Sequence, residues 1–179
     1  NSSDIVDLRA SLWTTHTEQT LITSAGAHIV QHWDTVVPNI VAVASVKGVT
    51  QTRSAAGQYN GFCQQGGLEV LERAGFLADG PRVGREALEL ANAPNCPTGD
   101  MDLLLMPDQM MLQIHESIGH PLELDRILGD ERNYAGTSFV TPDMFGSFQY
   151  GSDLLNVTYD PSHREQFASF AFDDEGQAA

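Results

Sequence analysis

Two histidines with four residues between them, His115 and His120, most constrain what this chain can fold into. With Glu116 directly after the first, they form the pattern HExxxH, one residue longer than the HExxH of many zinc peptidases. At roughly 100° per residue, side chains five positions apart lie about 140° apart around a regular α-helix. If both imidazoles are to serve one site, the helix that carries them must be deformed.

The residues beside the second histidine offer a way to deform that helix. Pro121 has no N–H, so the carbonyl of Ser117 loses the donor that a residue four positions on usually supplies. Gly119 tolerates unusual backbone angles. A wide turn or π-type bulge near Gly119 would rotate His120 back towards His115, and such bulges are common at functional sites.

The run carries the residue types of a catalytic metal site. Two imidazoles can hold a zinc ion, and an adjacent carboxylate can take a proton from a metal-activated water. The candidate zinc ligands are therefore His115 and His120, and Glu116 is the candidate general base. Glu123 and Asp125, one turn further on, are candidates to accept the other N–H of a ligating imidazole.

Two considerations weigh against this interpretation. An isolated His-Glu-His pattern lies more often on a solvated helix face than in a metal site, and a catalytic zinc usually takes three protein ligands plus water. Cys63 and Cys96 are explained more simply as small buried or loop residues. The other histidines follow no ligand spacing: His16, His28, His32 and His163. The spacing therefore names no third ligand.

Composition excludes several classes of function. The chain has 9 basic and 24 acidic residues, a net charge of −15, which argues against binding nucleic acid or an anionic membrane surface. No apolar run approaches the length that spans a bilayer. Two cysteines 33 positions apart suit neither a metal finger nor a disulfide framework, so a cytoplasmic, reducing setting is the expectation.

Hydrophobic periodicity predicts an α+β fold. Residues 1–56 alternate apolar and polar side chains between short turns, which indicates an antiparallel β-meander. The expected strands are Ile5–Thr15, Gln19–Ser24, Ala27–Thr35, Asn39–Lys47 and Val49–Ser54, with turns at Gly26, Pro38 and Gly48.

The rest of the chain is predicted to be helical first and loop-rich later. Residues 57–130 are expected to hold a loop (57–67), helices Gly67–Phe76 and Arg82–Asn92, a short strand Met101–Met106 and a motif-bearing helix from Pro107. Residues 131–179 are expected to form loops and a final strand, Gln166–Phe172. The residues expected to face inward are Leu68, Leu71 and Ala74, then Val83, Ala87, Leu90 and Ala91, then Met110, Met111, Leu112, Ile114 and Ile118. We take the three segments as parts of one continuous domain.

The run from His115 to Asp125 resembles the core motif of the TldD/PmbA family, metallopeptidases also known as modulators of DNA gyrase. Four further segments are similar to family segments: Ala135–Val140, the acidic turn Phe172–Gly176, and the stretches Ser54–Gly57 and Ala93–Met106 upstream. The chain departs from the family by extra residues between the motif and Ala135, Arg126–Asn133. It begins at Asn1 and stops soon after the expected final strand, so we expect it to be a piece of a longer polypeptide.

The resemblance implies a zinc peptidase of the TldD type that cleaves unfolded or short peptides. It implies that His115 and His120 bind Zn2+, that Glu116 activates water, and that a cysteine beyond this chain is the third ligand. It also implies a cytoplasmic protein that self-associates or pairs with a PmbA-type partner subunit lacking the motif. Two alternatives stay open: a non-catalytic regulatory or assembly module of the gyrase-modulator type, and an inactive truncated domain.

Overall fold

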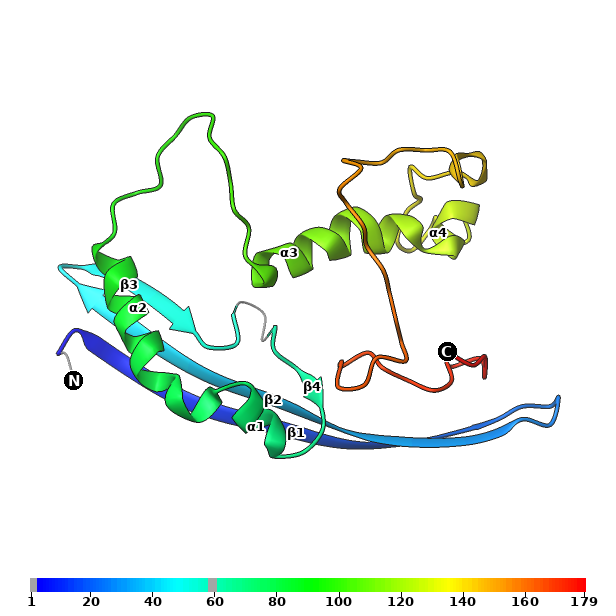
Figure 1. The fold of residues 1–179 in the computed structure, drawn as a ribbon, viewed down its shortest axis with the longest axis horizontal. Coiled ribbons are helices and arrows are strands. Elements are labelled where there is room, and N and C mark those ends of the chain that lie inside the picture. The colour runs from blue at the N-terminus through cyan, green and yellow to red at the C-terminus, as the bar shows by residue number, and fades with distance from the viewer. Residues whose placement is uncertain (1–2, 58–60) are drawn as a thin grey trace. The chain divides into compact units, whose positions relative to one another are not determined.

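The computed structural model describes residues 3–57 and 61–179. The first part of the chain forms a long antiparallel hairpin (Figure 1). Its strands are β1 (Ile5–Ile22) and β2 (His28–Val46), which pair along almost their whole length. The closing turn contains Gly26 with a φ of 97°, in the left-handed region that glycine enters without steric cost.

Two shorter strands pair with the other side of β2. β3 (Val49–Ser54) pairs with residues 41–46, and β4 (Gln64–Gln65) pairs with residues 35–36. The predicted antiparallel meander is therefore confirmed, with the order β1-β2-β3. β4 lies in the segment predicted as a loop, residues 57–67, of which residues 58–60 lie outside the described part of the chain.

The hairpin strands are longer than the sequence pattern predicted, because β2 runs straight through the predicted turn at Pro38. In an antiparallel strand, alternate residues direct their backbone groups to the same side. The carbonyls of Asp34 and Ile40 accept hydrogen bonds from the β4 and β3 side, so Pro38 faces that side too. It lies between the two paired segments, and its missing N–H costs no bond to β1.

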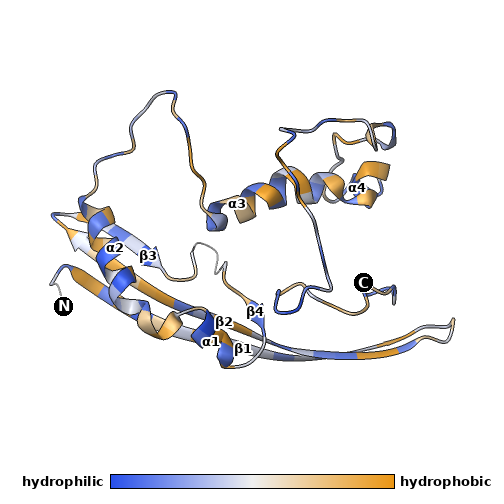
Figure 2. Cartoon of the chain, viewed as in Figure 1, coloured by the Kyte–Doolittle hydropathy of each residue, from blue (hydrophilic) through white to orange (hydrophobic). Residues whose placement is uncertain are grey.

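The helix α2 (Gly80–Asn92) packs on β2 and β3 and makes the core of this unit. Its first turn contains Pro81, whose missing N–H costs no intrahelical bond at that position. The buried residues of α2 are four positions apart and those of β2 are two positions apart, so each set lies on one face of its element. Together they form the buried cluster of Val83, Ala87 and Ala91 with Ile40, Ala42 and Ala44. The part of β2 under α2 is mainly hydrophobic, whereas hydrophobic and hydrophilic residues alternate towards the hairpin tip (Figure 2). Leu90 was wrongly predicted to face inward: it lies one position off the buried row and is 41% exposed.

A short helix, α1 (Glu69–Arg73), and a 3-10 turn, η2 (Phe76–Ala78), connect the sheet to α2. A helix was predicted here with Leu68, Leu71 and Ala74 facing inward; Leu71 and Ala74 are half-buried, but Leu68 was assigned wrongly. Val70 is the buried residue of α1, and Leu68 is 68% exposed. The buried face of so short a helix depends on its tertiary neighbours, and periodicity over five residues does not determine it.

A second compact unit, Asp100–Thr158, contains the HExxxH run. Its elements are α3 (Pro107–Ile114), a π-helix η3 (His115–Gly119), a 3-10 turn η4 (His120–Leu122), α4 (Leu124–Leu128) and a 3-10 turn η5 (Pro142–Met144). Along the motif helix, Met110, Ile114 and Ile118 are half-buried, whereas Met111 and Leu112 are exposed, contrary to prediction. Val140 is the one fully buried residue of this unit.

Two predicted strands are absent from the described residues. Residues 101–106 have no regular structure and are exposed, because no strand of their unit lies beside them to complete a ladder. Residues 166–172 form only isolated bridges, Gln64 with Gln166 and Phe172 with Ala178. The side chains of Gln31 and Gln65 hold this segment on the first unit by donating to its backbone carbonyls.

The first compact unit comprises the chain up to Gly99 together with Tyr159–Ala179. The three sequence segments proposed as parts of one domain stay a prediction. The α+β class is confirmed, since an antiparallel sheet is followed by helices. No helix in residues 3–57 and 61–179 is long and apolar enough to cross a membrane.

Candidate metal centre

The motif helix widens at the first histidine. From His115 to Gly119 it is a π-helix, and the N–H of His120 donates to the carbonyl of His115 five positions back. In such a turn, residues five apart become neighbours, as residues four apart are in an α-helix. The predicted π-type turn is therefore confirmed. Gly119, however, has φ −56° and ψ −67°, so its backbone does not need glycine.

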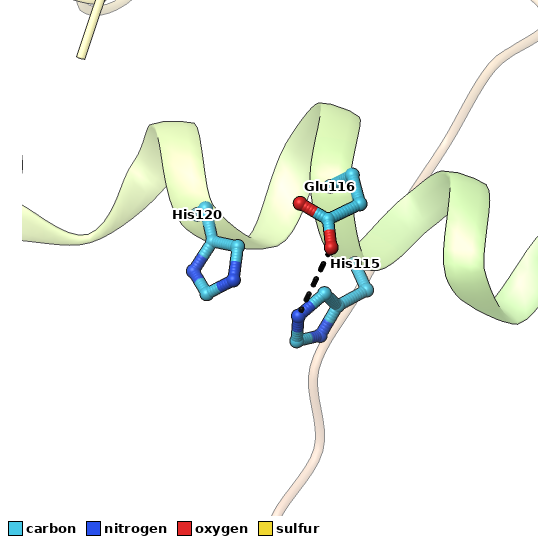
Figure 3. Close-up of side chains that lie close together, drawn as sticks. All are labelled: His115, Glu116 and His120. Atoms are coloured by element: carbon cyan, nitrogen blue, oxygen red, sulfur yellow. Dashed lines mark ion pairs between the residues drawn. The ribbon is translucent and has the colours of Figure 1, made fainter. Parts of the chain in front are cut away.

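This turn brings the three candidate side chains together (Figure 3). The donor atoms of His115, Glu116 and His120 all lie within 4.8 Å of one another, the single such cluster of three in the described chain. The two imidazole ring centroids are 4.3 Å apart, with their planes at 77°. Glu116 Oε1 lies 3.7 Å from His115 Nε2. His115 and Glu116 are exposed and His120 is half-buried, so the group is open to a ligand from solvent.

The donor set fits a zinc ion. Nitrogen ligands bind zinc at about 2.0–2.1 Å, so two of them on one ion lie at most about 4.2 Å apart. Donors within 4.8 Å need only small side-chain rotations to reach that separation. His115 and His120 would hold the metal, which leaves Glu116 free to handle a proton beside it.

Glu123 contacts the second histidine directly. Its Oε1 lies 2.7 Å from His120 Nδ1, and its Oε2 accepts from Arg126 Nε. These hydrogen bonds, first from His120 and then from Arg126, hold the pKa of the Glu123 carboxyl below its usual value. Asp125 does not take part: its Oδ1 accepts from the backbone N–H of Arg126.

The Glu123 contact decides which nitrogen of His120 can bind a metal. An ionised carboxylate only accepts hydrogen bonds, so it holds the proton on Nδ1 and leaves the Nε2 lone pair free. This is the arrangement in which metal-bound histidines are usually found. Among the residues suggested to orient an imidazole, Glu123 therefore has the required geometry and Asp125 does not.

The far side of the motif helix packs on aromatic residues of its own unit. A cavity of about 230 Å³ there is lined by Ser117, Ile118 and Pro121 from the helix and by aromatic residues from later in the chain. The rings of Phe139 and Tyr150 stack, with centroids 5.6 Å apart. None of the three donor side chains lines the cavity, so it backs the metal centre and does not open onto it.

Three residues that position the site were not predicted from the sequence. Arg126 contacts Glu123, Tyr150 contacts the carbonyl of Ser117, and Ser138 contacts the carbonyl of Pro121. Arg126 could have been found, because it lies three positions after Glu123 on the same helix face. Tyr150 and Ser138 lie in loops that bring them to the motif, and local sequence patterns do not predict contacts of this kind.

The remaining histidines and the cysteines belong to other surroundings. His16 pairs with Asp34 at 2.8 Å on the hairpin. Cys96 is exposed, and Cys63 is half-buried, where burial raises the pKa of its thiol. None of them lies in the donor cluster.

A known protein family resembles the part of the chain that contains the motif run. A family model described as the PmbA/TldA metallopeptidase C-terminal domain matches residues 98–179, a range that contains the whole HExxxH run. Over this range the chain is similar to the PmbA/TldD family. The resemblance of the motif run to this family is therefore confirmed.

Two curated relatives of the chain are named as metalloproteases. The one from Methanothermobacter thermautotrophicus is 33% identical over 101 residues, covering 49% of this chain and 22% of the relative. The one from Methanocaldococcus jannaschii is 33% identical over 90 residues, covering 50% of this chain and 18% of the relative. The chain thus spans a small part of the relatives that it matches. No solved structure matches it.

Proposed function

We propose that this protein is a zinc-dependent peptidase of the TldD type that hydrolyses unfolded or short peptides in the cytoplasm. The observation that carries the proposal is the π-turn that gathers His115, Glu116 and His120 within 4.8 Å. Its relatives' description as metalloproteases supports the choice of reaction. The free thiols of Cys63 and Cys96 agree with a reducing compartment.

In the proposed reaction, His115 and His120 bind the metal and Glu116 handles the proton. Zinc, when bound, would polarise the scissile carbonyl and acidify a water molecule. Glu116 would take the proton of the attacking water and pass it to the leaving amine. Its carboxylate is exposed beside the two imidazoles, and no lysine or arginine in residues 3–57 and 61–179 forms an ion pair with it.

The two histidines leave the ligand set one short of the three that catalytic zinc sites usually have. We propose that a cysteine outside these residues supplies the third ligand, and that the active protein self-associates or pairs with a PmbA-type subunit. The exposed faces of His115 and Glu116 leave room for a further ligand to approach.

The decisive experiment measures zinc content and peptide cleavage together in the intact protein. We expect about one zinc per chain, loss of zinc in His115→Ala, and loss of cleavage with zinc retained in Glu116→Gln. Glu72→Gln, an exposed helical glutamate of the first unit, is the matched control and should behave as the parent protein. Cleavage at the parent rate in Glu116→Gln would remove the peptidase proposal.

The two alternatives give different outcomes. A metal-free regulatory or assembly module would keep its function in both His115→Ala and Glu116→Ala. An inactive truncated domain would contain no zinc by itself, whereas a longer form of the protein would contain zinc and cleave peptides.

A further inference from the structure

We propose that Arg126 is a positioning residue of the metal centre: it holds Glu123 on His120 and fixes both to the Ala135 carbonyl. The inference rests on the proposed zinc site but not on the peptidase reaction. It gives a role to residues 126–133, which were expected from the sequence to be additional to the family pattern.

The guanidinium of Arg126 contacts each member of this group. Its Nε donates to Glu123 Oε2, and its Nη1 donates to the carbonyl of Ala135 at 2.8 Å. Its Nη2 lies 3.3 Å from His120 Nδ1, further away than Glu123 Oε1 at 2.7 Å. Glu123 is therefore the nearer partner of the imidazole. Arg126 keeps the Glu123 carboxylate turned towards the His120 ring.

The burial of Arg126 strengthens these contacts. Its side chain is 19% exposed, the least of the basic side chains that form ion pairs in residues 3–57 and 61–179. Hydrogen bonds to charged groups gain strength when water is excluded. The unit fully buries only Val140, so apolar packing alone does little to fix the motif's position.

Residues 126–133 form a turn that brings Ala135 to Arg126. Gly129 ends α4 in the left-handed conformation, with φ 91°, and the N–H groups of Gly129 and Asp130 both donate to the carbonyl of Asp125. A further turn follows, in which Ala135 N–H donates to the carbonyl of Glu131. Residues 126–133 thus fold back on α4, and the segment that follows them ends beside Arg126.

A second pair of contacts fixes the same segment to the motif. Ser138 Oγ donates to the carbonyl of Pro121 at 2.7 Å, and Ser138 N–H donates to the carbonyl of Arg126 at 3.3 Å. Arg126 is therefore anchored through both its backbone and its side chain. A lysine cannot reproduce this, because its single ammonium lacks the planar fork that reaches Glu123 and Ala135 together.

The test compares Arg126→Gln and Arg126→Lys with Arg132→Gln, an exposed arginine of the same turn. The intact protein is titrated with zinc against a competing chelator, and His120 imidazole nitrogens are observed by 15N NMR in the metal-free protein. We expect about tenfold weaker zinc binding in Arg126→Gln, at least partial loss in Arg126→Lys, and none in the control. We also expect a smaller share of the His120 tautomer with its proton on Nδ1.

The two readouts separate the possible outcomes. Unchanged zinc affinity in both Arg126 variants overturns the inference, and so does weaker affinity with an unchanged His120 tautomer, which would indicate a merely structural arginine. If the parent protein binds no zinc, the proposed function fails, and the tautomer comparison still decides the role of Arg126. If Glu116→Gln cleaves normally while Arg126→Gln loses zinc, only the proposed reaction fails.

Discussion

The hydroxyl of Tyr150 donates a hydrogen bond of 2.8 Å to the backbone carbonyl of Ser117. That carbonyl lies at the centre of the π-turn, and Pro121, four residues on, has no N–H to offer it. A side chain 33 residues away therefore supplies a donor where the helix cannot. The contact ties the loop after Val140 to the turn that brings the two histidines together.

Tyr150→Phe should weaken zinc binding by roughly threefold to tenfold, because a typical intramolecular hydrogen bond contributes about 1 kcal/mol. The phenyl ring would keep its stacking on Phe139, so the change isolates the hydroxyl. Zinc titration against a chelator measures the effect. Tyr134→Phe is the control, since Tyr134 is 93% exposed. Equal affinities in the two variants would mean that the π-turn does not depend on this donor.

Gly119→Ala should be tolerated, whereas Gly129→Ala should not. Gly119 has ordinary helical angles, and an added Cβ would meet only the carbonyl oxygen of Ile114 at 3.8 Å, a normal contact. Gly129 has a φ of 91°, where an alanine costs about 1–2 kcal/mol. Thermal unfolding and zinc affinity of the two variants compare the sites. A collapse of zinc binding in Gly119→Ala would show that the turn needs glycine after all.

The distorted helix at the motif was predictable because its cause is local. The five-residue spacing of His115 and His120 and the missing N–H of Pro121 are both visible in the sequence, and both concern one turn of helix. The prediction that the turn depends on the backbone freedom of Gly119 was wrong. A π-turn spreads its distortion over several residues, so no single one leaves the helical region.

The strand boundaries were less predictable because they depend on partners distant in sequence. Pro38 interrupts a strand only where its N–H is needed, and whether it is needed depends on which side β3 and β4 pair. Residues 101–106 have the composition of a strand but no neighbour to complete a ladder. The contact of Arg126 with Ala135 and that of Tyr150 with Ser117 escaped prediction likewise, since a loop brings each pair together.

Val83→Ala should destabilise the first unit by about 2 kcal/mol, because it opens a cavity under α2 where the side chain is fully buried. Leu90→Ala removes a larger side chain from the same helix but should cost less than about 1 kcal/mol, since that leucine is 41% exposed. Denaturant unfolding of both variants measures the difference. The reverse order would mean that the face of α2 towards Leu90 is covered in the intact protein.

The first turns of α2 carry a group of paired charges. Arg82 donates from Nε to Asp79 Oδ1 at 2.7 Å and from Nη1 to Glu86 Oε1 at 3.0 Å. Arg53 on β3 donates to Glu86 Oε2 at 3.0 Å and so joins the helix to the sheet. The hydrogen bonds from Arg82 hold the pKa of the Asp79 carboxyl below its usual value, and those from Arg82 and then Arg53 do the same for Glu86.

These depressed pKa values should make the first unit lose stability in acid. Carboxyls that titrate lower in the folded chain stabilise it fully above their unfolded pKa values, about 4, and this stabilisation disappears as the pH falls through the folded values. Arg82→Gln should remove most of it, at a cost of about 1 kcal/mol at neutral pH, since Arg53 still pairs with Glu86 and solvent screens the partly exposed pairs. Urea unfolding at pH 7 and at pH 3 measures the change, with Arg85→Gln as a control on the exposed side of the same helix. If Arg82→Gln and the parent protein lose equal stability between pH 7 and pH 3, these ion pairs contribute nothing to the acid sensitivity.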